Sequence, residues 1–418
     1  MKSEEREVVI KVVDEIMGAG KTSAAIDYIN KASKEKKFIV ITPYLKEVDR
    51  YKSECHEKDF QDPQPYKGTK VSGIKKLIYE NCNIVSTHSL FAKFDKEIIA
   101  LITRRNYTLI LDEVTDVIED FPMSGYDVAC LQDFFLDIDD VTGRAAWKKE
   151  HSNYDGRFSD IKELCDLGSL ACYGENKMLW IFPVEAFKAF KEVYVLTYMF
   201  YSQIQRYYFD LYGLKYTYWY VTSNFEFSEY PDGEISNYNY RELIHVCNRK
   251  SLNEIGDAPY SLSKTWYERC QEGDGRLEAL KKNLYNFFTN VCKGKSSDIL
   301  WTTFIDVKEV LKGKRYGSES CFLSMNARAT NEKKDRCNVA YTVNRFINPI
   351  IKQFFRTKGV TVDEDGYALS EMIQFIWRSS VREGNEINVY VPSKRMRKLL
   401  MKWIDENSPE ERNNEETQ

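Results

Sequence analysis

The sequence lacks the features that define disulfide-rich, zinc-binding and membrane-spanning proteins. Its ten cysteines are scattered over 418 residues without a CxxC pair, which argues against a disulfide framework or a zinc site. The four histidines form no HExxH pattern, so a zinc protease is not expected. No uncharged apolar run approaches the ~18–20 residues that a membrane helix needs. The opening residues MKSEEREVVI lack the apolar stretch of a signal peptide, and we expect a cytoplasmic protein without a membrane segment.

The composition is that of a folded protein with more than one domain. Hydrophobic residues make up 43% of the chain and charged residues 30%, which excludes a mostly disordered polypeptide. At roughly 100–200 residues per domain, the length corresponds to two or three domains.

The net charge of -4 conceals an uneven distribution. Residues 116–175 carry 14 acidic and 5 basic side chains, and residues 405–418 carry 6 acidic and 1 basic, which leaves a net charge of +10 for the rest of the chain. A mildly basic body of this kind suits contact with a phosphate backbone. Surface charge that varies without functional meaning explains the same numbers equally well.

Short apolar runs separated by segments of helical composition predict an α/β protein with parallel sheets. In the first half of the chain, the predicted strands are residues 8–13, 38–42, 83–86, 109–111 and 193–197. A second series follows, with strands at 299–304, 321–324 and 387–391 and helices at about 339–355, 369–382 and 393–403.

The composition divides the chain into four predicted regions. Residues 1–222 form a first domain, which contains an acidic, turn-rich insertion at 116–180. Residues 223–274 are polar and turn-rich and are expected to form a linker. Residues 275–404 form a second domain, and residues 405–418 form a disordered acidic tail. The aromatic block at 194–220 suits either core packing, which we favour, or base stacking.

The first predicted strand leads into a loop and then a helix, with the loop sequence Met17-Gly18-Ala19-Gly20-Lys21-Thr22. Glycines allow backbone N–H groups to close around phosphate oxygens at a helix N-terminus, so this segment is a candidate ATP-binding loop. Lys21 is expected to reach the β- and γ-phosphates and Thr22 to ligate Mg²⁺. Glu15 stands where the first glycine of the full P-loop pattern belongs. The alternative is a helix-opening loop with a chance GKT sequence.

A second candidate element is the apolar strand at 109–111 followed by Asp112 and Glu113. Asp112 is expected to hold Mg²⁺, and Glu113 is expected to orient and deprotonate the attacking water. Strands often end in acidic residues, so the pattern is weak by itself. Its position, 91 residues after Lys21, strengthens it.

A third candidate element runs from Gln374 to Arg382. Arg378 and Arg382 are four residues apart on a predicted helix, so they are expected to share one face and to stabilise charge on the γ-phosphate. An ordinary solvated basic helix face is the alternative, and it is favoured when this segment is considered alone.

In this order, the three elements resemble those of the superfamily 2 DExx-type helicases and translocases. The resemblance covers residues 10 to 400, and several segments are most similar to small helicase-like proteins of bacterial viruses. The matching segments are 18–22 (motif I), Thr42-Pro43 with Arg50 downstream (motif Ia), Thr87-His88 (motif Ic), 112–115 (DExx box), Thr197 (motif III), Thr302 (motif IV), Arg328 (motif V) and 374–382 (motif VI).

This resemblance implies two RecA-like parallel-sheet domains in tandem, which close around ATP and Mg²⁺ while single-stranded nucleic acid lies across both. It implies catalytic roles for Asp112, Glu113, Gln374, Arg378 and Arg382, and a coupling role for Thr197. The residues expected at the nucleic acid, mainly at its backbone, are Thr42, Pro43, Arg50, Thr87, His88, Thr302 and Arg328. Single-stranded DNA is the expected substrate more than RNA.

The expected function is therefore an ATP-dependent helicase or translocase that moves on or unwinds DNA or RNA. If virus-encoded, it would act in the host cytoplasm, in genome replication or recombination. One alternative is a non-processive, ATP-gated clamp or adaptor that binds a partner protein through residues 116–180. A second is a terminase-like packaging ATPase, which would need a nuclease domain with clustered acidic residues.

Overall fold

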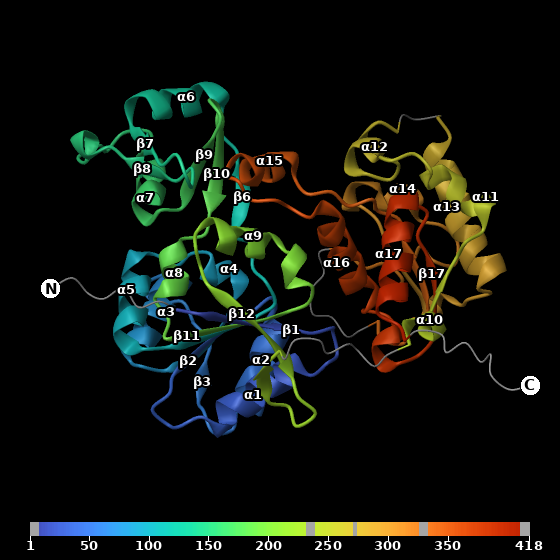
Figure 1. Cartoon of the computed structure of the whole chain (residues 1–418), viewed down its shortest axis with the longest axis horizontal. Helices are drawn as coiled ribbons and strands as arrows, with labels where there is room; N and C mark the ends of the chain where they lie inside the picture. The colour runs from blue at the N-terminus through green and yellow to red at the C-terminus, as the bar shows by residue number, and fades with distance from the viewer. Residues whose placement is uncertain (1–7, 231–238, 271–273, 326–332, 410–418) are drawn as a thin grey trace, which may run out of the picture. The chain divides into compact units, whose positions relative to one another are not determined.

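The computed structural model describes residues 8–230, 239–270, 274–325 and 333–409, and the chain forms two compact units. The first unit contains the chain up to Tyr230 together with Asn348–Asp363, and the second contains the rest. Each unit is built on a parallel sheet covered by helices, which confirms the predicted α/β class (Figure 1). Among the described helices, none combines the length and apolar composition that crossing a lipid bilayer requires.

The first unit is organised around an eight-stranded sheet in which only the edge strand β13 is antiparallel to its neighbour. Its five predicted strands all form. In spatial order the strands are β13 (Phe227–Glu229), β12 (Tyr216–Val221), β1 (Ile10–Asp14), β11 (Glu192–Thr197), β5 (Thr108–Asp112), β2 (Phe38–Thr42), β4 (Asn83–Thr87) and β3 (Phe60–Gln61).

Both faces of this sheet are buried, because alternate strand residues enter different cores. Val13, Val40 and Ile110 pack with helices α1 (Lys21–Lys31) and α2 (Leu45–Glu54). The neighbouring residues on the same strands enter the second core. That core is completed by α3 (Lys70–Tyr79), α4 (His88–Phe91), α5 (Lys96–Arg105), α8 (Val184–Lys188) and α9 (Ile204–Leu211).

The aromatic block at 194–220 belongs largely to these cores. Its fully or almost fully buried members are Tyr194, Phe200, Tyr207, Tyr208 and Phe209. At roughly 1.5–3 kcal/mol for each large apolar side chain, this burial is a major contribution to the stability of the unit.

A smaller folded region lies between β5 and β11 in the chain. It has a three-stranded antiparallel sheet of order β6–β10–β9, a two-stranded β7–β8 pair and a core of its own around Val128, Leu131 and Trp147. Its elements are β6 (Ile118–Phe121), α6 (Gly125–Phe134), β7 (Leu136–Ile138), β8 (Ala145–Trp147), α7 (Ser159–Leu167), β9 (Leu170–Tyr173) and β10 (Lys177–Ile181).

Helix α15 (Pro349–Thr357) belongs to the first unit, although 275–404 was expected to lie wholly in a second domain. Phe354 and Phe355 are buried in the larger core of the first unit, together with residues of β6 and β10. The prediction of a helix at 339–355 is also wrong, because strand β16 (Asn338–Tyr341) occupies its first residues and α15 starts only at Pro349. Asn348 caps that start by accepting a hydrogen bond from the N–H of Ile350 at 2.8 Å.

The second unit contains a four-stranded parallel sheet of order β14–β17–β16–β15. The strands are β14 (Ile244–Val246), β15 (Ile299–Thr302), β16 (Asn338–Tyr341) and β17 (Ile387–Tyr390). Its helices include α10 (Tyr240–Leu243), α11 (Lys250–Asn253), α12 (Lys264–Glu268), α13 (Arg276–Asn286), α14 (Lys308–Leu311), α16 (Glu364–Ile376) and α17 (Lys394–Glu406).

Three expectations for this unit differ from the structure. Residues 223–274 do not form a simple linker, because β14 is an edge strand of the sheet and Leu252, Leu262 and Tyr267 are buried in its core. The expected strand at 321–324 is reduced to a single bridge between Phe322 and Trp301. Helix α17 extends to Glu406, so the predicted acidic tail begins inside a helix.

Candidate nucleotide-binding site

The loop between β1 and α1 lies at the carboxyl end of the parallel sheet, where ligands of such sheets bind. Gly18 and Gly20 have φ values of 96° and 87°, a left-handed conformation that glycine adopts without strain. Among the described residues, no side chain caps the first turn of α1, which starts after Gly20. Its first backbone N–H groups can therefore donate to an external ligand as their partner. This is the local geometry that phosphate oxygens require.

Lys21 is only 8% exposed, and its ammonium group is held by the loop itself. Its Nζ donates hydrogen bonds to the backbone carbonyls of Glu15 at 2.5 Å and Ile16 at 3.2 Å. Burial lowers the pKa of Lys21, and the nearby carboxylates of Glu113 and Asp112 act in the opposite direction. Charged phosphate oxygens would be stronger acceptors for this ammonium group than neutral carbonyls.

The structure brings Thr22 and Asp112 together, although they are 90 residues apart. Thr22 Oγ1 donates to Asp112 Oδ2 at 3.2 Å, and the hydroxyl of Tyr51 donates to the same oxygen at 3.2 Å. Burial, followed by repulsion from Glu113 and Glu47, raises the pKa of Asp112 to about 7. A hydroxyl and a buried carboxylate in contact are oxygen ligands of the type that Mg²⁺ prefers, so these residues fit the predicted ion.

Strand β11 lies between β1 and β5 and connects both acidic strand ends. The carbonyl of Thr197 accepts from the N–H of Glu15 at 3.0 Å, and the carbonyl of Leu196 accepts from the N–H of Glu113 at 2.9 Å. In the described part of the chain, the buried Thr197 hydroxyl has no hydrogen-bond partner. Glu113 has a φ of 77°, a conformation that is strained for a residue other than glycine.

Asp14 is a further, partly buried acid that the sequence analysis did not select. Its Oδ2 accepts from the N–H of Phe200 at 2.9 Å, which joins the end of β1 to the segment after β11. Burial raises the pKa of Asp14 to about 6, although the Phe200 N–H and the charge of Lys21 act against this shift. A carboxylate at the end of a strand was the only sequence signal for this residue, and many strands end that way.

Residues of the β12–β13 hairpin also contact the loop, and nothing in the sequence indicated this. A side chain at Gly20 would place its Cβ 2.8 Å from the ring of Phe225. The hydroxyl of Tyr230 donates to Glu15 Oε1 and to the carbonyl of Asp14, both at 3.2 Å. Glu15, which replaces the first P-loop glycine, is therefore anchored by an aromatic residue more than 200 positions away.

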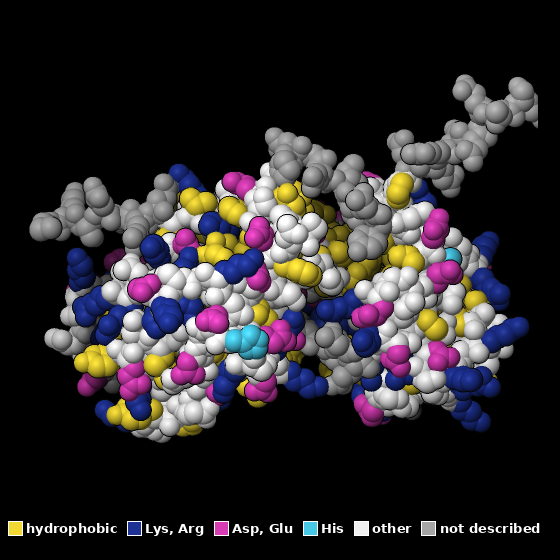
Figure 2. Space-filling model, turned by 90° about the horizontal axis from the view of Figure 1, so that it is seen from below, with side chains coloured by type: hydrophobic (Ala, Val, Ile, Leu, Met, Phe, Trp, Pro, Cys, Tyr) yellow, Lys and Arg dark blue, Asp and Glu magenta, His cyan; other side chains and the backbone are white. Residues whose placement is uncertain are grey.

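The residues predicted to contact nucleic acid differ in how exposed they are. Thr42 and Thr302 are fully buried in strands β2 and β15, which differs from their expected role as surface phosphate contacts. Arg50 donates to Ser23 Oγ at 3.1 Å and pairs with Glu54, while Thr87, His88 and Pro43 are partly exposed. Figure 2 shows lysine and arginine side chains interspersed with acidic ones over the face it displays.

In the second unit, the expected helix face with two arginines does not form. Helix α16 ends at Ile376, because Ser379 adopts an extended backbone and its hydroxyl donates to the carbonyl of Ile376 at 2.6 Å. Arg378 is buried and its Nε donates to the carbonyl of Gln374 at 3.1 Å. Arg382 lies in a separate short 3-10 helix, Ser380–Glu383. Arg328 lies outside the described residues.

Solved structures of helicases are among those with a similar chain trace. An XPD helicase structure has a TM-score of 0.46 and 11% identity, and the match covers 94% of each chain. The structure of Xpd4 from S. tokodaii has a TM-score of 0.42 and 12% identity, over 96% of this chain and 95% of that one.

Two family models match the sequence itself. Residues 118–180 match the YonV middle domain, and residues 238–404 match the YonV C-terminal Rossmann-like domain. The SPbeta prophage-derived protein YonV of Bacillus subtilis (strain 168) is 40% identical over 413 residues, which cover 95% of this chain and 98% of that protein. The chain therefore belongs to the YonV family.

Proposed function

We propose that this protein is an ATP-dependent helicase or translocase that acts on nucleic acid, with single-stranded DNA as its expected track. The observation that carries the proposal is the contact of Thr22 with Asp112 beside the buried ammonium of Lys21, at the carboxyl ends of parallel strands. A phosphate-binding loop, a hydroxyl and an acidic strand end in this arrangement support nucleoside-triphosphate hydrolysis.

In this proposal the residues of the first unit have distinct roles. The backbone N–H groups of the 17–20 loop and Lys21 bind the phosphates, and Lys21 exchanges its carbonyl partners for phosphate oxygens. Thr22 and Asp112 would hold Mg²⁺, which supplies charge neutralisation at the phosphates. Glu113 orients the attacking water and accepts its proton. Thr197 couples the two acidic strand ends through β11.

Pro43, Arg50, Thr87 and His88 would contact the nucleic-acid backbone, which carries little sequence information. Membership of a family with a prophage relative supports a role in viral genome replication or recombination in the bacterial host cytoplasm.

The test is ATP hydrolysis by the full chain with and without single-stranded DNA, single-stranded RNA and duplex DNA. We expect stimulation by single-stranded DNA and a loss of at least 100-fold in Lys21→Ala, since this ammonium supports the transferred charge. Lys31→Ala is the matched control, because Lys31 lies at the exposed end of the same helix. Hydrolysis that is indifferent to every nucleic acid, or that survives Lys21→Ala, would contradict the proposal.

A second candidate function is an ATP-gated clamp or adaptor that acts through a protein partner. It is favoured by the separate core of residues 118–180 and by aromatic side chains exposed on α6. A strand-displacement assay separates the two functions, because a clamp hydrolyses ATP on nucleic acid without unwinding a partner duplex.

A further inference from the structure

The outward face of helix α6 carries apolar side chains that no described residue covers. Tyr126, Cys130 and Phe134 follow one another at four-residue spacing, which places them along one side of the helix. Tyr126 is 92% exposed and Phe134 is 62% exposed, and Cys130 is also exposed. The opposite side, with Val128 and Leu131, is buried in the local core. An isolated exposed aromatic residue is ordinary, but an aligned set on one helix is typical of an interaction surface.

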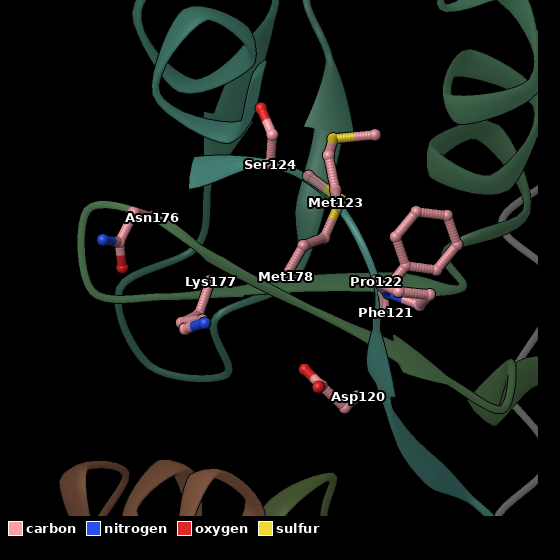
Figure 3. Close-up of a pocket in the computed structure, with 8 residues that line it drawn as sticks. All are labelled: Asp120, Phe121, Pro122, Met123, Ser124, Asn176, Lys177 and Met178. Carbon is pink, nitrogen blue, oxygen red and sulfur yellow. The ribbon is translucent and has the colours of Figure 1, made fainter. Parts of the chain in front are cut away.

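A pocket of about 410 Å³ with a mixed polar and apolar lining lies beside the start of α6. Its lining comes from two segments, residues 120–124 and 176–178, which Figure 3 shows around the opening. Phe121, Pro122 and Met123 supply apolar side chains there. Ser124 connects the pocket to the helix, because its hydroxyl caps α6 by accepting from the N–H of Asp127 at 3.2 Å. We name the exposed side of α6 together with this pocket the α6 surface.

The region that carries the α6 surface has a net negative charge. Residues 118–180 contain 13 acidic and 6 basic side chains. Three of the basic side chains lie beside the surface: Lys177 lines the pocket, Lys148 donates to the Asp133 carbonyl at 3.0 Å, and Arg157 pairs with Asp127. Asp120 borders the pocket, Asp133 lies on α6, and Glu175 lies in the turn that contacts α6 through Gln132 and the Gly174 carbonyl at 3.0 Å. None of these three carboxylates forms an ion pair with a residue that the structure describes. A positively charged partner would therefore find free acceptors at the edge of an apolar stripe.

We propose that the α6 surface is the docking site for a basic amphipathic segment of another protein. Apolar side chains of that segment would pack along Tyr126, Cys130 and Phe134 and enter the pocket, while flanking lysines or arginines would pair with the free carboxylates. Charge opposes a second copy of this chain, since two surfaces of the same negative sign would face each other. Charge opposes nucleic acid for the same reason. The proposal does not depend on ATP hydrolysis and goes beyond the proposed function.

The probe is a synthetic helical peptide with leucines at i, i+3, i+4 and i+7 and lysines elsewhere. Its controls are the same composition in scrambled order and a version with glutamate in place of lysine. Binding to the full chain is measured by fluorescence anisotropy. Alkylation of Cys130 by iodoacetamide, followed by mass spectrometry, localises the contact. Cys130 is exposed, whereas the other nine cysteines are buried or partly buried.

We expect the amphipathic lysine peptide to bind and to slow alkylation of Cys130, and the two controls to do neither. The double variant Tyr126→Ser/Phe134→Ser should weaken binding at least tenfold without changing basal ATP hydrolysis. Tyr79→Ser is the matched control, because Tyr79 is 69% exposed on α3 in the same unit and should not affect binding. Circular dichroism verifies that the double variant is folded.

Four outcomes would overturn the proposal. Equal binding of the scrambled peptide would show that charge alone accounts for the binding. Unchanged affinity in the double variant would place the peptide elsewhere. Slower alkylation of Cys130 as the concentration of the chain itself increases would identify a second copy as the occupant. Slower alkylation of Cys130 in the presence of a single-stranded DNA oligonucleotide would identify nucleic acid as the occupant of the α6 surface.

Discussion

The two units differ in how well their motif residues converge. In the first unit, Thr22 donates a hydrogen bond to Asp112. Lys21 donates to a backbone carbonyl of the loop that precedes it. In the second unit, Arg378 follows the end of α16 and donates back to the Gln374 carbonyl, and Arg382 lies on a separate turn. The first group depends on strand ends, which a parallel sheet aligns automatically. The predicted face with both arginines required α16 to continue for six residues beyond its end at Ile376.

The largest expected effect tests whether the residues that meet in the first unit catalyse ATP hydrolysis. Glu113→Gln should lower ATP hydrolysis at least 100-fold, because the amide cannot accept a proton from water. Binding of a fluorescent ATP analogue should remain within a few-fold of that of the unchanged chain. The control is Glu119→Gln, an exposed acid on β6. Hydrolysis retained in Glu113→Gln would remove this residue from the chemistry.

The next effect tests the contact between the loop and the β12–β13 hairpin. Gly20→Ala should destabilise the first unit by about 3 kcal/mol, since it combines left-handed strain with a clash against Phe225. Gly213→Ala has similar strain but open space around it, so it should cost only about 1–2 kcal/mol. Hydrogen exchange of β1 and β11 measures the difference. Equal losses in the two variants would mean that the hairpin contact does not constrain the loop.

A pH effect tests the partly buried acid Asp14. Its pKa is about 6 in the folded chain, above the ordinary value of 3.8, so the folded state retains a proton that the unfolded state releases. Stability from this group is therefore present below about pH 4 and is lost as the pH rises through 6. The total loss is on the order of 3 kcal/mol, at about 1.4 kcal/mol per pKa unit. In Asp14→Asn, urea unfolding of the first unit should lack this component, while a pH dependence identical to that of the unchanged chain would contradict the assignment.

The smallest effect concerns the two arginines of the second unit. Arg378→Ala should cost about 1.5 kcal/mol in stability, because it removes a buried guanidinium that donates to the Gln374 carbonyl. Arg382→Ala, at a partly exposed position, should leave stability within about 0.5 kcal/mol. Thermal unfolding followed by tryptophan fluorescence compares them. A reversed order would show that Arg382 is the structural residue of the pair.

Local patterns predicted the strands of the first unit well and the connections of the second unit poorly. The runs at 38–42 and 193–197 are apolar enough to be buried on both sheet faces, so their strands were evident from composition alone. Residues 338–341 have the same character, but the helical composition that follows them concealed the strand β16. Residues 223–274 are polar and turn-rich, and only pairing with β17 makes 244–246 a strand.

The sequence by itself determined the α/β class, the loop ahead of Lys21 and the acidic end of β5, because these depend on residue type and on neighbouring positions. The tertiary structure decided which distant groups complete the site. Tyr51, Phe225 and Tyr230 contact the loop or its acids only because the sheet order places their strands and helices beside β1 and β5. No local pattern records such contacts, since packing between elements is governed by shape and burial over the whole unit.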